Sequence, residues 1–130
     1  METTSSSFIF GSLNCDGVRR NANYVTDLCD SLKPHILCLQ ETWLYECNDH
    51  FLGTIHDDYA YYCISAATPD DRYITGHAYG GVAILTRTDV RNTRFVKTDS
   101  KRLCALTFVV NNVSILVVNV YMPVDPQITF

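Results

Sequence analysis

Apolar runs alternate with polar breaks along the first forty positions of the chain. Residues 7–15 form a short run that favours a strand, and residues 35–40 form a continuously apolar run, typical of a strand buried on both faces. Between them, residues 21–32 place apolar side chains three and four positions apart, which predicts an amphipathic helix that ends at Pro34. This order predicts a βαβ unit, whose two parallel strands end at the same edge of a sheet.

After residue 41 the pattern changes to a series of short strands. We predict strands at 59–64, 80–86, 92–97, 103–110 and 113–121, with a short helix or helical turn near 47–53. Asn111 and Asn112 tolerate positive φ and predict a two-residue hairpin turn between the last two strands. Residues 68–81, which include His77, are rich in turn-forming residues and predict a loop. The alternation of strand and helix, followed by consecutive strands, predicts an α/β fold.

Composition is typical of one globular domain. The chain has 130 residues, of which 47% are hydrophobic, and a formal net charge of −4. Binding nucleic acid through a broad basic face requires clustered Lys and Arg, so the acidic balance argues against such a face. The acidic balance does not exclude a smaller, local binding site for nucleic acid.

Cysteine usage and the amino-terminal residues bear on the compartment. The six cysteines include no C-x-x-C pair and lie mostly in apolar segments. We interpret them as small buried side chains of a reduced compartment and not as a zinc site. The opening METTSSS lacks a basic start and an apolar stretch, and Asn111, Asn112 and Ser114 interrupt the most apolar segment. We therefore expect an intracellular protein with no secretory signal and no membrane partner.

Polar, metal-capable side chains follow both strands of the predicted βαβ unit. Asn14 and Asp16 lie at the end of the first strand, and Glu41 directly follows the second. Ligands bind at the carboxyl ends of strands in such sheets, and Mg²⁺ takes carboxylate and amide oxygens together with water and substrate phosphate. Alternatively, Asn14 and Asp16 bond the local backbone in a turn, and Glu41 is a surface charge or a charge at a helix N-terminus. The residues alone leave both interpretations open.

Four segments, in this order and spacing, resemble the endonuclease/exonuclease/phosphatase superfamily over nearly the entire chain. They are LNCDGVRRN, PHILCLQETWL, GGVAILTR and VVNVYMP. Trp43 and Leu44, after Glu41, resemble the endonuclease domains of non-LTR retrotransposons more than the apurinic/apyrimidinic repair endonucleases. The resemblance implies a partial four-layer α/β sandwich with two sheets packed face to face, in which a mixed sheet carries helices on one face.

The resemblance also implies roles for individual residues. Glu41 would be the principal ligand of Mg²⁺, or of Mn²⁺, with Asn14 and Asp16 as further ligands. Tyr121 matches a tyrosine that touches the scissile phosphate, which makes Asn14, Glu41 and Tyr121 the candidate catalytic residues. Arg19 matches a residue that contacts the nucleic-acid backbone. The alternatives are a hydrogen-bonded Tyr121 at a sheet edge and a solvated Arg19. His77 matches no catalytic position.

Two motifs of the superfamily are absent from residues 1–130. They are an Asp-x-Asn pair after the tyrosine strand and a Ser-Asp-His near the carboxyl end, which orient and activate the attacking water in the expected mechanism. We therefore expect residues 1–130 to be a truncated domain, its amino-terminal half. A half-domain would leave a sheet face uncovered, so we also expect poor solubility or self-association.

Two functions from different classes are consistent with these motifs. The first is Mg²⁺-dependent phosphodiester hydrolysis of DNA, as the endonuclease domain of a retrotransposon-type protein whose missing residues lie outside this chain. A nuclear location would follow from that function, because no basic targeting cluster supports it. The second is a catalytically inactive remnant of such a domain. A phosphatase or lipid phosphodiesterase of the same superfamily is a lesser alternative.

Overall fold

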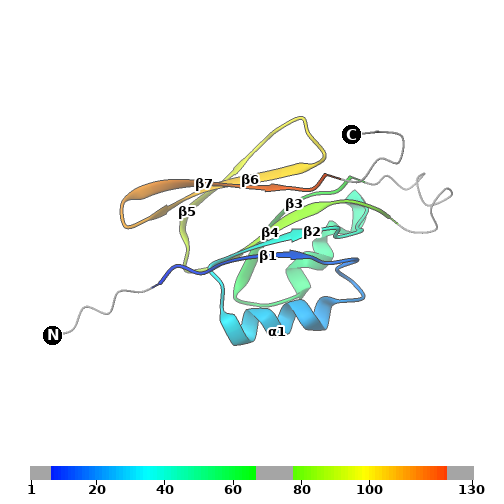
Figure 1. Ribbon diagram of the computed structural model, residues 1–130, viewed down its shortest axis with the longest axis horizontal. Helices are drawn as coiled ribbons and strands as arrows, with labels where there is room; N and C mark the ends of the chain where they lie inside the picture. Colours follow the sequence, from blue (N-terminus) through cyan, green and yellow to red (C-terminus); the bar gives the residue numbers. More distant parts are fainter. Residues whose placement is uncertain (1–6, 67–77, 123–130) are drawn as a thin grey trace, which may run out of the picture.

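Figure 1 shows a computed structural model, which describes residues 7–66 and 78–122. The elements in chain order are β1 (Phe10–Asn14), α1 (Ala22–Leu32), β2 (Ile36–Gln40), the 3₁₀ helix η1 (Glu46–Thr54), β3 (Tyr59–Ile64), β4 (Val82–Arg87), β5 (Arg91–Val96), β6 (Leu103–Val110) and β7 (Val113–Val120). Every predicted strand and helix is present, with ends that differ by up to a few residues. Most of the predicted loop at 68–81, including His77, lies outside the described residues.

The βαβ prediction is confirmed. β1 and β2 pair in parallel, with Phe10 opposite Ile36 and Asn14 opposite Gln40. α1 forms the crossover between them and buries Val25 on the sheet. β1 ends at Asn14 and β2 ends at Gln40, directly before Glu41. The two strand ends therefore lie side by side at one edge of the sheet.

The first sheet is mixed and has the strand order β1-β2-β4-β3. β4 lies between β2 and β3 and is antiparallel to both of them. α1 and η1 cover one face of this sheet (Figure 1), and the buried core beneath them includes Val25, Leu37, Leu39, Leu52 and Leu85. The predicted arrangement of a mixed sheet with helices on one face is confirmed.

The second sheet is antiparallel, has the order β5-β6-β7, and packs on the other face of the first. A second core fills the space between the sheets, and its fully buried members include Ile36, Ile84, Leu106 and Phe108. Asn111 and Asn112 join β6 to β7 with φ of 50° and 64°, as a tight hairpin turn requires. The described residues thus form three layers, helices on sheet on sheet, of an α/β sandwich.

The outer face of the second sheet is apolar and exposed. Leu116, Val118 and Val120 of β7 are 58%, 47% and 48% exposed. Within the described ranges, both helices lie on the first sheet, and this outer face has no helix over it. No helix in those ranges is long and apolar enough to cross a membrane.

Candidate functional site

The backbone angle φ of Glu41 determines the direction of its side chain. Leu37 and Leu39 of β2 face the helices, whereas Gln40 faces the second sheet. The alternation of a strand would point Glu41 toward the helices as well. Instead, Glu41 has φ of 55°, in the left-handed region that non-glycine residues rarely adopt, and its Oε1 accepts a hydrogen bond from the Tyr121 hydroxyl at 2.7 Å. The left-handed conformation at the end of β2 therefore aims the carboxylate at the end of β7.

Tyr121 lies directly after β7 and completes this pair. Its backbone N–H donates to the carbonyl of Arg102 at 2.9 Å, which extends the pairing of β7 with the segment before β6. The hydrogen bond to Glu41, together with burial and the nearby negative charge, raises the pKa of Tyr121 to about 12. The hydroxyl is therefore protonated at neutral pH and acts as a hydrogen-bond donor.

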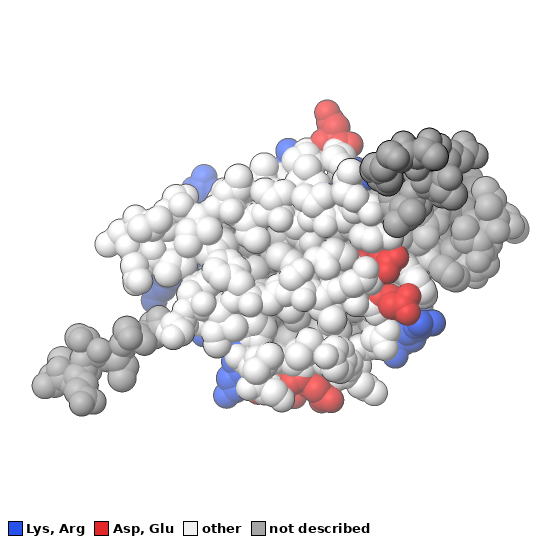
Figure 2. Space-filling model, viewed as in Figure 1, with Lys and Arg blue, Asp and Glu red and all other residues white. Residues whose placement is uncertain are grey.

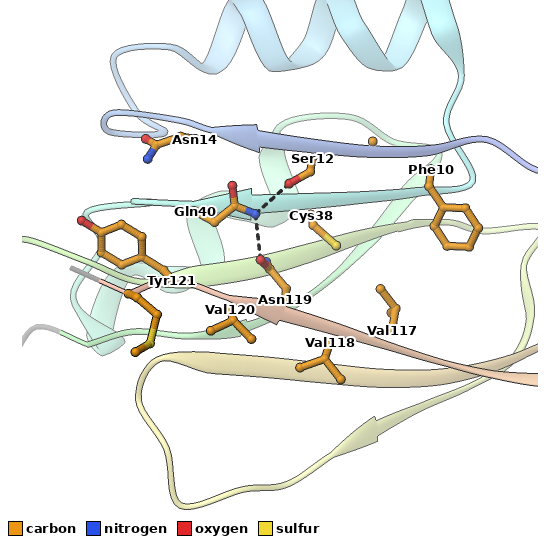
Figure 3. Close-up of a pocket in the computed structure, with 12 residues that line it drawn as sticks. Phe10, Ser12, Asn14, Cys38, Gln40, Val117, Val118, Asn119, Val120 and Tyr121 are labelled. Atoms are coloured by element: carbon orange, nitrogen blue, oxygen red, sulfur yellow. Dashed lines mark hydrogen bonds between the residues drawn. The ribbon is translucent and has the colours of Figure 1, made fainter. Parts of the chain in front are cut away.

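A network of amide side chains joins the two sheets beside this pair (Figure 3). The Asn119 side chain is 3% exposed, and its Nδ2 donates to the carbonyls of Leu39 and Ala83 at 2.9 and 2.7 Å. Gln40 Nε2 donates to Asn119 Oδ1 at 2.8 Å and to Ser12 Oγ at 3.1 Å. These bonds tie β7 to β2 and β4, one residue before Glu41 and two residues before Tyr121. Asn119 was not predicted as a functional residue, although it is the one amide side chain in the run VVNVY.

The loops after β1 and β2 hydrogen-bond to each other and to the residues before β4. Gly17 N–H donates to the carbonyl of Glu41 at 2.9 Å, and Trp43 N–H donates to the carbonyl of Gly80 at 3.0 Å. Asp16 and Trp43 also have positive φ, of 49° and 56°. Strained backbone of this kind persists only where neighbours hold it, and it is common at functional sites. The strand ends therefore form a fixed scaffold around Glu41.

Asn14 and Asp16 are close to Glu41 along this scaffold but have other partners. Asn14 Oδ1 accepts from the backbone N–H of Asp16 at 3.2 Å, the local turn that was the alternative interpretation of this segment. The Asp16 carboxylate forms a salt bridge with Arg20. Asn14 also lines a cavity of about 660 Å³ between β1 and β7, shared with Tyr121 (Figure 3). The structure therefore pairs Glu41 with Tyr121, places Asn14 at the same edge, and directs Asp16 toward Arg20.

A smaller cavity opens directly beside the Glu41 and Tyr121 pair. Its volume is about 300 Å³, and its lining includes Glu41, Tyr121, Lys101, Arg102 and the backbone of residues 80–81. Its lining therefore brings one carboxylate, one tyrosine hydroxyl and two cationic residues together. Lys101 and Arg102 were not predicted as site residues, because nothing local to residues 100–102 indicates that they lie next to this cavity.

Arg19, the predicted contact to the nucleic-acid backbone, lies next to η1. Its guanidinium carbon is 5.3 Å from the centre of the Phe51 ring. The neighbouring Arg20 lies 5.2 Å from the centre of the Trp43 ring. Figure 2 shows acidic and basic side chains side by side at this end of the molecule.

The donor set at this edge suits a hard divalent cation. Among the described residues, no group of three or more His, Cys, Asp or Glu could hold a metal ion. Mg²⁺ does not need such a group, because proteins usually bind it through one or two carboxylates together with water and substrate phosphate. Glu41 is a partly exposed carboxylate, and Asn14 and Asp16 add an amide and a second carboxylate nearby. These residues fit Mg²⁺ or Mn²⁺ and lack the thiolate or imidazole ligands typical of a zinc site.

Comparison with known proteins decides the family. The family model described as "Endonuclease/Exonuclease/phosphatase family" matches residues 11–127. The chain belongs to this family. The nucleases of the endonuclease/exonuclease/phosphatase family generally depend on a divalent metal ion, which agrees with the donor set around Glu41. A search of the curated proteins found no match.

Solved structures with the endonuclease/exonuclease/phosphatase fold resemble this chain at low sequence identity. An AP endonuclease from Archaeoglobus fulgidus has a TM-score of 0.61 at 20% identity, covering 90% of this chain and 42% of that one. The AP endonuclease LMAP from Leishmania major has a TM-score of 0.63 at 19% identity, covering 88% and 39%. A 3′ phosphatase, NExo from Neisseria, bound to a product DNA hairpin, has a TM-score of 0.56 at 21% identity, covering 88% and 41%. This likeness establishes the fold, and the match spans about two fifths of the length of these proteins.

Proposed function

We propose that this chain carries the metal-binding and phosphate-binding part of an endonuclease domain that hydrolyses phosphodiester bonds in DNA. The observation that carries the proposal is the cavity of about 300 Å³ in which Glu41, Tyr121, Lys101 and Arg102 meet. A carboxylate beside two cations and a neutral hydroxyl suits a metal-assisted reaction at a phosphate group, because cations and donors bind the phosphate oxygens.

Three further findings support DNA as the substrate and a retrotransposon-type parent. The family includes nucleases, and the similar NExo structure from Neisseria holds a DNA hairpin. Trp43 and Leu44 follow Glu41 as in the retrotransposon branch of the superfamily. Such a parent would work in the nucleus.

Glu41, Asn14 and Asp16 would hold the cation, Mg²⁺ or alternatively Mn²⁺. When bound, the ion supplies Lewis-acid polarisation of the phosphoryl group and stabilises charge on the leaving oxygen. Lys101 and Arg102 attract the phosphate and hold it in the cavity. Tyr121 keeps its proton at neutral pH because its pKa is about 12, so its single O–H donates to Glu41 and orients that carboxylate in the site.

We further propose that residues 1–130 are the amino-terminal part of the domain. The similar structures of Archaeoglobus fulgidus and Leishmania major are matched over only 42% and 39% of their length. The Asp-x-Asn and Ser-Asp-His motifs, which would orient and activate the attacking water, are absent from these 130 residues. In this proposal they are supplied by sequence outside the chain.

The test is Mg²⁺-dependent nicking of supercoiled plasmid by a domain in which residues 1–130 continue through the Asp-x-Asn and Ser-Asp-His motifs, together with titration of Mn²⁺ binding by electron paramagnetic resonance. We expect Glu41→Ala to weaken Mn²⁺ binding and to reduce nicking by roughly 10²-fold or more. Glu46→Ala, an exposed glutamate in η1, is the matched control and should change neither. Equal background nicking by all three proteins would instead indicate a catalytically inactive remnant, and unchanged Mn²⁺ binding in Glu41→Ala would overturn the ligand assignment.

A further inference from the structure

Arg20 lies over the ring of Trp43 at the edge of the candidate site. Its guanidinium carbon lies 5.2 Å from the centre of the Trp43 ring, within the range of a cation–π contact. The same guanidinium donates through Nη2 to Asp16 Oδ2, four positions earlier in the chain. Two partners therefore fix the plane of a side chain that is otherwise flexible.

The surrounding backbone explains why the Trp43 ring stands in this position. A Cβ atom at Gly17 would lie 2.7 Å from Trp43 Cε3, so the ring packs against a residue that has no side chain. Gly17 has φ of 91° and Trp43 has φ of 56°, so both loops adopt the left-handed conformation where they meet. The stack therefore consists of the Trp43 indole with the bare backbone of Gly17 and the guanidinium of Arg20 packed against it.

One face of the stack is open to solvent. The Arg20 side chain is 63% exposed and that of Asp16 is 57% exposed. The loop that carries Gly17 donates its N–H to the Glu41 carbonyl at 2.9 Å, which places the stack beside the candidate metal ligand.

The charge balance of the stack indicates which part of a nucleic acid it would contact. The Asp16 carboxylate compensates the charge of Arg20, so the pair attracts a phosphate less strongly than Lys101 and Arg102 do in their cavity. The flat face remains available, because a hydrogen bond to a carboxylate lies in the guanidinium plane. Nucleobases stack on guanidinium planes and on aromatic rings whatever their sequence.

We propose that the open face of Arg20, backed by Trp43, is a stacking platform for an unpaired nucleobase adjacent to the scissile phosphate. This inference rests on the proposed function for its ligand, a nucleic acid, but not on catalysis. In this role Arg20 acts through its planar shape, and Lys, which carries the same charge on a flexible stem, cannot replace it.

The test measures binding of single-stranded oligonucleotides with 2-aminopurine at successive positions, in EDTA so that no cleavage occurs. We expect quenching at one position in the wild-type complex. Arg20→Lys and Arg20→Ala should both abolish that quenching and weaken binding at least about fivefold, with an unchanged slope of log affinity against log salt. Arg94→Lys, at an exposed arginine of β5, is the matched control and should keep the quenching. Thermal melts of each variant establish that it is folded.

The alternative outcomes are distinct. If Arg20→Lys retains wild-type affinity and quenching, Arg20 acts as a point charge and the platform is overturned. If Arg20→Lys and Arg20→Ala both match the wild type, the pair with Asp16 is only a solvated surface contact. If the wild type binds no oligonucleotide, both this inference and DNA as the substrate fail. Wild-type quenching without plasmid nicking would leave the platform supported and count against the catalytic proposal alone.

Discussion

The meeting of Glu41 and Tyr121 depends on a single residue in an unfavourable conformation. The left-handed conformation costs a residue with a Cβ about 1–2 kcal/mol relative to ordinary backbone. The hydrogen bonds from Gly17 to the Glu41 carbonyl and from Trp43 to Gly80 hold the segment in place. The position of Glu41 at a strand end was predictable from the sequence, and so was its candidacy as a ligand. The direction of its side chain was not, because φ at Glu41 is set by contacts with residues distant in the chain.

The charge of Glu41 should be measurable through the titration of Tyr121. Glu41→Gln removes the negative charge and weakens the hydrogen bond, so we expect the pKa of Tyr121 to fall from about 12 toward its ordinary value. Nuclear magnetic resonance of tyrosines labelled at Cζ reports this titration, and Tyr121→Phe identifies the signal. Glu46→Gln is the control for the loss of one exposed glutamate. An unchanged titration of Tyr121 in Glu41→Gln would show that the two side chains do not interact in solution.

The raised pKa of Tyr121 also makes the free energy of unfolding depend on pH. The folded state holds the Tyr121 proton more tightly than the unfolded state does, so the contribution of this proton to stability is complete below the ordinary pKa of tyrosine. It is lost as the pH rises from that value through about 12. The free energy of unfolding of the wild type should therefore decrease more steeply over this range than that of Tyr121→Phe.

At the scale of elements, the features that could be predicted from the sequence are those set by residues adjacent in the chain, namely strand bounds and turns. The bounds of β3 and β6 agree with the prediction, because apolar alternation and turn residues mark their ends locally. The same is true of the turn at Asn111 and Asn112. The insertion of β4 between β2 and β3 was not predictable, since strand order depends on pairing between distant segments. Asn119 was missed for the same reason, because its partners Leu39 and Ala83 lie 80 and 36 positions away.

Asn119 should contribute strongly to the docking of the two sheets. Asn119→Leu keeps the approximate size but leaves two buried carbonyls and the Gln40 amide without their partner. We expect it to lower the free energy of unfolding by about 2–4 kcal/mol. Urea denaturation followed by circular dichroism measures the change. The matched control is Asn23→Leu at an exposed position of α1, which should change stability by less than about 0.5 kcal/mol. A similar small effect for Asn119→Leu would mean that the network does not hold the sheets together.

At the scale of the whole molecule, the exposed outer face of the second sheet determines whether we expect the isolated chain to associate with itself. The face-to-face packing of two sheets followed from the family resemblance, and no local pattern in the sequence would have predicted it. The expectation from the sequence was a sheet face without its partner sheet, whereas in the structure the two sheets pack on each other and the exposed apolar face is an outer one. It lies on the outside of β7, at Leu116, Val118 and Val120, and a buried core that includes Ile84, Leu106 and Phe108 packs between the two sheets.

We expect this face to cause self-association of the isolated chain. Val118→Lys places a charge at the centre of the apolar strip and should shift the population toward monomer, because burying an unpaired charge opposes contact. Sedimentation velocity over a range of concentrations measures the distribution. Asn23→Lys adds the same charge at an exposed position of α1, away from this strip, and should leave association unchanged. A wild-type chain that stays monomeric and melts cooperatively would contradict the expectation.

The hydrogen bond between Tyr121 and Glu41 also has a consequence for the order of folding. It joins residues 80 positions apart, whereas β1, α1 and β2 are consecutive in the chain and pair locally. Contacts between distant segments form more slowly than local ones, because a long loop must close first. During synthesis, a chain that has emerged only as far as β4 can already carry Glu41 and Asn14 on an assembled sheet. The hydroxyl of Tyr121 arrives only when the final hairpin has docked, so the site is completed late and its integrity reports on the folding of both sheets.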